Sequence, residues 1–168
     1  MNKLSIILGG ARSGKSAFAE QLVEGFDLPK TYIATAQALD GEMAARIAEH
    51  QTRRTGWTTI EAPLDLVAAL QSVPEGSVVL IDCLTLWLSN HMLQDSDVDI
   101  DGLLAAIAAS PSPVICVSNE VGMGLVPDNA LGRKFRDAQG ILNRRIAERA
   151  DLAVFVAAGL PLVLKGSL

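Results

Sequence analysis

Short runs of consecutive apolar residues alternate along the chain with longer stretches that are amphipathic or rich in helix-forming residues. The first pattern is typical of the buried strands of a parallel sheet, and the second of helices that pack on such a sheet. Strands are predicted at residues 4–8, 30–34, 57–61, 77–82, 113–118, 152–157 and 162–164. Helices are predicted at residues 17–25, 40–54, 63–71, 84–93, 102–109 and 129–150. This alternation predicts a three-layer α/β fold with ligands at the carboxyl ends of the strands.

The carboxyl-terminal part of the chain refines this prediction. Only Gly159-Leu160-Pro161 separates the last two strands, which is too short for a parallel crossover, so the final strand is predicted to be an antiparallel edge. The long helix at residues 129–150 is expected to turn one apolar face inward. The residues predicted for that face are Leu131, Phe135, Ile141, Leu142 and Ile146.

The first predicted strand runs into Gly9-Gly10-Ala11-Arg12-Ser13-Gly14-Lys15-Ser16, which has the Gly-x4-Gly-Lys-Ser spacing of a P-loop. Gly9 and Gly14 are expected to adopt backbone angles that strain other residues, so that N–H groups converge on a phosphate chain. Lys15 would neutralise the terminal phosphates, and the Ser16 hydroxyl would be a ligand of Mg²⁺. The alternative is an ordinary glycine-rich turn between a strand and a helix.

Two further sets of residues are candidates for chemistry. Asp82 ends a buried strand and is interpreted as a carboxylate linked to Mg²⁺, the alternative being a cap of the next helix. His50 shares one predicted helical face with Arg46, Arg53 and Arg54, which suggests a phosphate site around a nucleophilic imidazole. The alternative for these residues is a solvated basic face.

Two acidic residues and a second histidine are also noted. Glu61 and Glu120 lie at predicted strand ends, where each could bind a ligand or simply be exposed. His91 is interpreted as structural.

Composition and charge narrow the classes of function. A length of 168 residues fits one domain, residues 1–168, and the net charge of -5 argues against general affinity for nucleic acid. No apolar run approaches the ~18 residues of a membrane span, and the chain leads directly into a strand rather than a signal peptide, so a cytoplasmic protein is expected. Cys83 and Cys116 are expected to be buried, reduced thiols.

Further short motifs follow the P-loop in order over nearly the full chain. They are Tyr32-Ile33-Ala34-Thr35-Ala36, Glu42-Met43 with Arg46-Ile47 and His50, Trp57 with Glu61, residues 82–90 (DCLTLWLSN), residues 118–127 (SNEVGMGLVP), and Phe135-Arg136-Asp137 with Gly140 and Asn143. With the P-loop, they resemble the bifunctional adenosylcobinamide kinase/adenosylcobinamide-phosphate guanylyltransferase family of cobalamin biosynthesis. The Ser-Asn-Glu-Val-Gly loop and the Arg-Ile-x-x-His helix are the most specific of these motifs.

The resemblance implies two reactions. A nucleoside triphosphate, GTP or ATP, would phosphorylate the aminopropanol hydroxyl of adenosylcobinamide. GMP would then pass from GTP to that phosphate, giving adenosylcobinamide-GDP and pyrophosphate. In this family a histidine carries GMP as a phosphoramidate, and the matching position is His50.

The resemblance also implies the binding residues, the fold and the assembly. The catalytic residues would be His50 and Lys15, with Mg²⁺ held at Ser16 and Asp82. The fold would be a three-layer, RecA-like P-loop NTPase with an antiparallel carboxyl-terminal edge, and the protein would be a homotrimer. Besides the P-loop, the guanine-nucleotide contacts would fall on Ala34, Thr35, Ala36, Gln51, Thr52, Arg53, Arg54, Glu61 and Asp82.

Two other functions are compatible with a P-loop alone. A small kinase for another metabolite would keep Lys15 and Asp82 but would have no use for a nucleotidylated His50. A regulatory GTPase would need a guanine-reading Asn-Lys-x-Asp stretch, and the sequence contains none.

Overall fold

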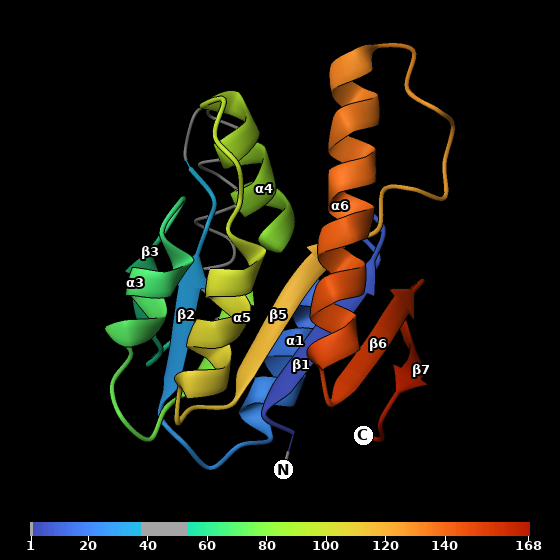
Figure 1. Ribbon diagram of the computed structural model, residues 1–168. Coiled ribbons are helices and arrows are strands. Elements are labelled where there is room, and N and C mark those ends of the chain that lie inside the picture. Colours follow the sequence, from blue (N-terminus) through green and yellow to red (C-terminus); the bar gives the residue numbers. More distant parts are fainter. Residues whose placement is uncertain (1, 38–53) are drawn as a thin grey trace.

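The computed structural model describes residues 2–37 and 54–168. Within this part of the chain, seven strands form one sheet in the order β3-β2-β4-β5-β1-β6-β7 (Figure 1). Neighbouring strands are parallel throughout, except for the antiparallel pair β6 and β7 at one edge. The strands are β1 (Leu4–Gly9), β2 (Lys30–Ala34), β3 (Thr58–Glu61), β4 (Val78–Asp82), β5 (Val114–Asn119), β6 (Leu152–Ala157) and β7 (Leu160–Lys165). The predicted α/β class and its antiparallel edge are confirmed.

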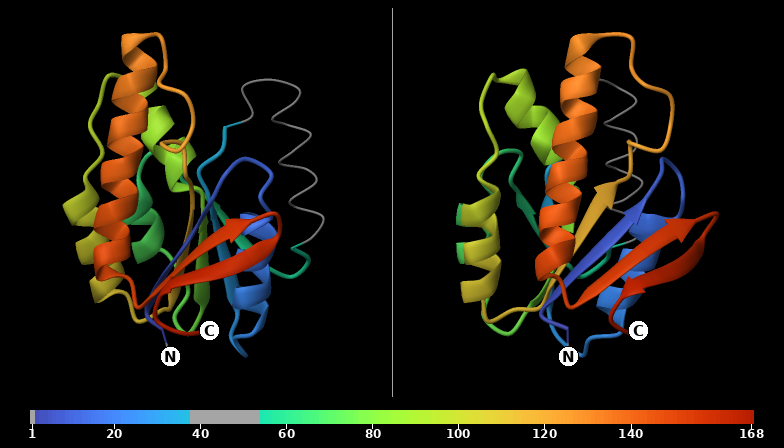
Figure 2. Two further views of the ribbon diagram at one scale, coloured as in Figure 1. Left: turned by 90° about the vertical axis from the view of Figure 1, so that its right-hand side faces the viewer. Right: turned by 45° about the vertical axis from the view of Figure 1, so that its right-hand side comes forward.

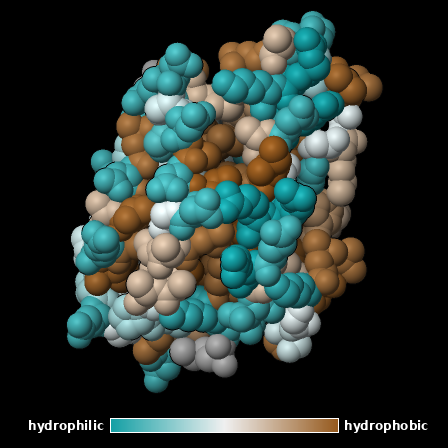
Figure 3. All heavy atoms as spheres, viewed as in Figure 1, coloured by the Kyte–Doolittle hydropathy of each residue, from teal (hydrophilic) through white to brown (hydrophobic). Residues whose placement is uncertain are grey.

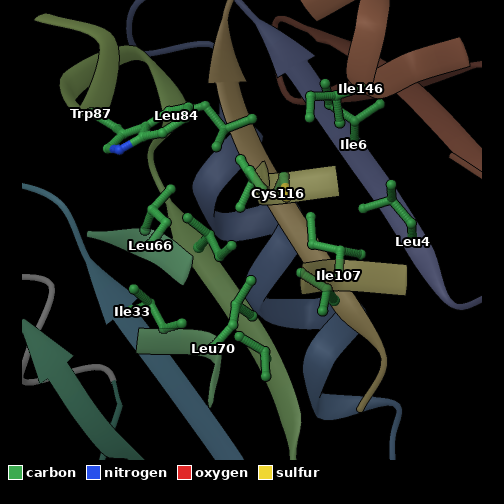
Figure 4. Close-up of a cluster of buried hydrophobic side chains, with 14 of the residues drawn as sticks. Leu4, Ile6, Ile33, Leu66, Leu70, Leu84, Trp87, Ile107, Cys116 and Ile146 are labelled. Atoms are coloured by element: carbon green, nitrogen blue, oxygen red, sulfur yellow. The ribbon is translucent and has the colours of Figure 1, made fainter. Parts of the chain in front are cut away.

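Helices cover both faces of the sheet (Figure 2). One face is covered by α1 (Lys15–Glu24), whose Ala19 and Val23 pack with Ile7, Ile115 and other strand residues of one buried cluster. The opposite cluster joins the strands to the remaining described helices (Figure 4). These helices are α3 (Leu66–Gln71), α4 (Leu84–Leu93), α5 (Ile100–Ala109) and α6 (Ala130–Arg149). The layers therefore follow from strands that are apolar on both faces, such as β4, in which residues 78–81 are buried.

Two helix starts differ from the prediction because aspartates cap them. The predicted helix at 63–71 begins instead at Leu66, where the Asp65 carboxylate accepts a hydrogen bond from the Ala68 N–H at 2.8 Å. The helix predicted from residue 102 begins at Ile100, because the Asp99 carboxylate accepts from the Gly102 N–H at 2.8 Å. In both cases the side-chain oxygen satisfies an N–H of the first turn, which has no backbone partner.

The inward face of α6 was predicted only in part. Leu142 and Ile146 are buried and Phe135 packs against the same cluster, but Leu131 is 61% exposed and Ile141 is 49% exposed. The first turns of α6 project beyond the ends of the strands, which leaves Leu131 without a sheet to cover (Figure 1). The inward positions of α6 recur at spacings of three and four residues. They pass through Gln139, which is fully buried, and not through Ile141.

Two other expectations concern the membrane and the thiols. No described helix is both long and apolar enough to cross a membrane. Cys83 and Cys116 are free and buried, as predicted. Burial raises the pKa of the Cys83 thiol to about 11, with a smaller contribution from the Asp82 charge, and burial raises the pKa of Cys116 to about 12. Both thiols are therefore protonated at neutral pH.

Candidate active site at the carboxyl ends of the parallel strands

The P-loop connects the end of β1 to the start of α1 at the carboxyl edge of the sheet. The Ser13 N–H donates to the Gly10 carbonyl at 3.3 Å, and the chain passes through positive φ at Arg12 and Gly14. Gly14 occupies the N-cap position with φ 94° and has no side chain to cap the helix. The first N–H groups of α1 therefore point out of the helix end without a side-chain cap, which suits an anion.

The two glycines that define the P-loop spacing, Gly9 and Gly14, are needed for different reasons. Gly14 has a left-handed backbone, and a Cβ there would also lie 3.1 Å from the Gly159 Cα. Gly9 belongs to β1 and is not among the positive-φ glycines, so the expectation of a special backbone angle was wrong at this position. A Cβ on Gly9 would instead collide with the Val156 carbonyl oxygen at 2.5 Å and with the Ser13 hydroxyl. Gly9 is therefore required by space and Gly14 by conformation.

Neighbouring loops hold the P-loop on two sides. The Glu120 N–H, just after β5, donates to the Gly9 carbonyl at 3.0 Å, and the Gly159 N–H in the β6–β7 turn donates to the Ser13 carbonyl at 2.8 Å. The Glu120 carboxylate accepts from the Gly122 N–H at 2.6 Å. The structure thus brings Glu120, a candidate of the sequence, next to the P-loop.

Lys15 and Ser16 lie in the first turn of α1. The Lys15 ammonium donates to the Gly10 carbonyl at 3.2 Å, so its side chain folds back over the loop that would hold the phosphates. The Lys15 charge is also near enough to the end of β4 to lower the pKa of Cys83, although burial and Asp82 outweigh it. The Lys15 ammonium therefore lies at the P-loop, on its Gly10 carbonyl.

Asp82 ends β4, which is two strands from β1 in the sheet. At ~4.8 Å per strand the backbones of β1 and β4 are about 10 Å apart. Side chains, water and phosphate oxygens around one Mg²⁺ can span that separation. The N-cap position of α4 is held by Cys83 rather than by Asp82. The position of Asp82 thus favours the metal interpretation over the helix-cap alternative.

A hydroxyl and a carboxylate at this edge suit Mg²⁺. Mg²⁺ prefers oxygen ligands, keeps several waters and binds through one or two protein groups together with substrate phosphates. Ser16 in the first turn of α1 and Asp82 at the end of β4 offer that donor set. Among the described residues no group of three or more His, Cys, Asp or Glu could hold a metal ion.

Thr35, a predicted nucleotide contact at the end of β2 beside Ala34 and Ala36, is fully buried. Its hydroxyl accepts from the Cys83 N–H at 2.8 Å and donates to the Cys83 carbonyl at 2.7 Å. The Thr35 hydroxyl is therefore engaged with the backbone that follows Asp82.

Arg54, another predicted nucleotide contact, is also engaged inside the protein. Its side chain is 4% exposed, and Nη1 lies 3.3 Å from Oε1 of Glu20 on α1. Its Cζ lies 3.3 Å from the centroid of the Tyr32 ring. Burial, reinforced by the charge of Asp82, raises the pKa of Tyr32 far above its usual value, so the ring is neutral.

The other predicted residues are not brought to the P-loop by the described structure. Glu61 is exposed at the end of β3, four strands and about 19 Å of sheet from β1. Arg46, His50 and the predicted contacts Gln51, Thr52 and Arg53 lie outside the described residues.

The contacts of His91 fit its interpretation as structural. Its Nδ1 lies 2.9 Å from the Ser96 hydroxyl and its Nε2 lies 3.2 Å from the Leu64 carbonyl. The ring also packs edge-on against Trp87. Both ring nitrogens are thus used locally, at the end of α4.

Sequence reasoning missed a buried polar network beside the P-loop. The Asn143 amide on α6 donates to the Asn119 carbonyl at 2.9 Å, and the Asn119 N–H donates to the Thr85 hydroxyl at 2.7 Å. Ser118 and Gln139 complete the network through Asn143. The available signal was the spacing of Gln139 and Asn143, which are four residues apart on one helical face. The network positions the end of β5, from which Glu120 reaches Gly9.

Comparison with known proteins places this arrangement in a family. A family model described as cobinamide kinase / cobinamide phosphate guanyltransferase matches residues 5–164. The chain belongs to this cobinamide kinase and guanyltransferase family. It is 51% identical over 167 residues to the bifunctional adenosylcobalamin biosynthesis protein CobP of Pseudomonas aeruginosa, covering 96% of each chain. It is 39% identical over 181 residues to the bifunctional adenosylcobalamin biosynthesis protein CobU of Salmonella typhimurium, covering 95% of this chain and 98% of the relative.

The fold is shared more widely than the family. An ATPase of the type III secretion system of pathogenic bacteria superimposes with a TM-score of 0.56 over 95% of this chain, at 11% identity. The chain spans 56% of that protein, and at this identity the likeness shows the fold alone.

Proposed function

We propose that this protein catalyses the two reactions of its family, phosphorylation of adenosylcobinamide and transfer of GMP from GTP to the resulting phosphate. The observation that carries the proposal is the family match over residues 5–164, which includes a P-loop built at the carboxyl edge of the sheet. Phosphorylation of another metabolite would account for the P-loop alone. It would not account for relatives at 51% and 39% identity that are named bifunctional and match along nearly their whole length.

In the kinase reaction, the aminopropanol hydroxyl attacks the γ-phosphorus of GTP or ATP and the nucleoside diphosphate leaves. Lys15 and the first N–H groups of α1 hold the phosphate oxygens and stabilise the charge that develops on them. Ser16 and Asp82 would hold Mg²⁺, which would neutralise charge on the phosphates. Lys15 and Ser16 are the last two residues of the P-loop motif, and Asp82 ends β4, two strands from β1 in the sheet.

In the guanylyltransferase reaction, an imidazole nitrogen of His50 attacks the α-phosphorus of GTP and pyrophosphate leaves. The phosphate of the corrinoid then attacks the same phosphorus, which breaks the phosphoramidate bond and releases His50. Arg46 and Arg53 are near His50 in sequence and would stabilise charge on the phosphorus oxygens. Gln51 and Thr52 complete the proposed contacts of this segment.

Labelled nucleotides test the two reactions separately. After incubation with α-labelled GTP, the protein should carry label that is labile to acid and stable to base, and the His50→Asn variant should carry none. With γ-labelled GTP or ATP, the label should move to adenosylcobinamide in the wild type and fail to do so in Lys15→Ala. Covalent GMP on His50→Asn at the wild-type rate would place the nucleophile elsewhere, and full kinase activity in Lys15→Ala would contradict the role of the P-loop.

We also propose that the enzyme is cytoplasmic and homo-oligomeric, with a trimer as the expected state. The edge strand β7 supports an assembly because its residues are exposed on both faces, with Leu160, Leu162 and Leu164 between 57% and 72% exposed. Figure 3 shows hydrophobic atoms along the right-hand edge of the molecule, where Figure 1 places β6 and β7. An uncovered apolar edge strand is a pairing and aggregation hazard unless something covers it. Sedimentation of the wild type and of Leu162→Lys tests this, because a monomeric wild type would refute it.

A further inference from the structure

Every polar group of Thr35 is hydrogen-bonded, and three of the four bonds go to the backbone of Asp82 and Cys83. Its N–H donates to the Asp82 carbonyl at 3.3 Å, and its hydroxyl bonds to both the N–H and the carbonyl of Cys83. Its own carbonyl accepts from the Asn90 amide at 2.9 Å. Thr35 is fully buried, so none of these bonds competes with bulk water.

These bonds surround the residue that carries the proposed metal ligand. Ala34 pairs with Asp82 in the β2–β4 register, and Thr35 extends that contact by one residue beyond the end of the strands. Beyond it, the Cys83 carbonyl also accepts from the Trp87 N–H at 3.2 Å in the first turn of α4. The backbone at Asp82 is therefore held from β2 on one side and from α4 on the other.

Asn90 extends this arrangement to the next loop. Its amide donates both to the Thr35 carbonyl and to the Pro63 carbonyl, each at 2.9 Å. Asn90 is itself 7% exposed and lies on α4, two turns after Asp82. The end of β2, the segment between β3 and α3, and the helix after Asp82 are thus joined through the Asn90 amide.

We propose that Thr35 is a positioning residue for Asp82 and that its hydroxyl makes no contact with the nucleotide. The proposal rests on the proposed function, because it takes Asp82 to hold Mg²⁺. A hydroxyl that already donates to one buried oxygen and accepts from one buried N–H has little left to offer a ligand. Removing it leaves the Cys83 N–H without its partner, and the backbone at Asp82 is then free to shift.

The test compares Thr35→Val, which keeps the shape and loses the hydroxyl, with Thr35→Ser, which keeps the hydroxyl. Two affinities are measured on the full chain. One is the affinity for Mn²⁺ in the presence of a non-hydrolysable GTP analogue, followed by electron paramagnetic resonance. The other is the affinity for the same analogue in EDTA, without metal.

Thr35→Val should weaken Mn²⁺ binding about tenfold and leave metal-free nucleotide binding unchanged, and Thr35→Ser should restore most of the Mn²⁺ affinity. Turnover of Thr35→Val should fall by up to about a hundredfold, since a misplacement near 1 Å can cost that much. In the Asp82→Asn background, Thr35→Val should cause no further loss of Mn²⁺ affinity, because Thr35 acts through Asp82. Thermal unfolding of each variant shows that the measurements are made on folded protein.

The outcomes distinguish a failure of the positioning role of Thr35 from a failure of the metal role of Asp82. If Thr35→Val weakens metal-free nucleotide binding, the hydroxyl is a nucleotide contact and the inference is wrong. If Asp82→Asn weakens Mn²⁺ binding but Thr35→Val does not, the metal role of Asp82 stands and only the inference fails. If Asp82→Asn binds Mn²⁺ like the wild type, the proposed metal role of Asp82 fails and the positioning role fails with it.

Discussion

The Arg54 guanidinium lies over the ring of Tyr32, with Cζ 3.3 Å from the ring centroid. The same guanidinium pairs with Glu20 on α1, and the next aromatic residue, Trp57, donates from Nε1 to Glu24 at 3.0 Å. Because Glu20 and Glu24 are one turn apart, α1 holds the chain at two points just before β3. The helix that begins with the P-loop lysine is thereby tied to the end of the segment that contains His50.

Arg54→Ala should destabilise the protein by about 3 kcal/mol, since it removes one partner of a largely buried ion pair together with the packing of the guanidinium on Tyr32. Urea unfolding measures the loss. The matched control is Arg144→Ala, whose ion pair with Glu148 is exposed and should contribute less than about 0.5 kcal/mol. Equal losses in the two variants would show that the Arg54 contacts contribute nothing beyond a surface pair.

The P-loop glycines should differ sharply in their tolerance of alanine. Gly9→Ala forces a Cβ against the Val156 carbonyl, and Gly14→Ala places a Cβ on a left-handed backbone close to Gly159. Each should cost about 1–3 kcal/mol of stability and weaken GTP binding. Gly10→Ala is the control, because a Cβ there meets nothing within 4 Å. Melting temperatures and GTP titrations check the order, and a Gly10→Ala variant as unstable as Gly9→Ala would contradict it.

Asp151 should make stability depend on acid pH. Its carboxylate accepts from the backbone N–H groups of Leu4 and Lys3, at 3.1 Å and 2.7 Å, and these bonds lower its pKa from the usual 3.8. A lowered folded-state pKa contributes stability that is complete above the unfolded value and is lost as the pH falls through the folded value. Asp151→Asn should therefore be less stable than the wild type at pH 7, and the difference should shrink below about pH 4.

The control for this prediction is Asp97→Asn, at an exposed position between α4 and α5. Urea unfolding from pH 2 to pH 7 should show a difference from the wild type that changes with pH for Asp151→Asn, and Asp97→Asn is measured beside it as the reference for an exposed Asp→Asn substitution. A constant difference for Asp151→Asn would mean that its carboxylate is not held by the start of β1.

The loop after β5 should contact the corrinoid. Met123, Leu125 and Val126 are 81%, 95% and 66% exposed, and the loop begins at Glu120, which is bonded to the P-loop. Leu125→Ser should raise the KM for adenosylcobinamide several-fold while leaving the rate of covalent GMP labelling unchanged. The control is Leu168→Ser, the same substitution at another exposed leucine, which is 67% exposed. It should change neither quantity. A normal KM in Leu125→Ser would place the corrinoid elsewhere.

The sequence by itself determined the strands, most of the helices and the P-loop, because each depends on neighbours along the chain. Continuous apolar runs predicted β4 and β5 as central strands, and the short link at Gly159 predicted the antiparallel edge. The spacing of Gly9, Gly14 and Lys15 predicted a strand, a loop and a helix start, all of which the structure contains.

Only the tertiary structure decided which side chains are available to a ligand. Thr35 and Arg54 are in motifs that predict nucleotide contacts, yet the hydroxyl bonds to Cys83 and the guanidinium packs on Tyr32. Gly9 needs its missing side chain because β6, which is far away in sequence, brings the Val156 carbonyl beside it. Thr35 and Cys83 are 48 positions apart, and the residues joined by β1 and β6 are more than a hundred positions apart. Local periodicity along the chain does not record contacts over such distances.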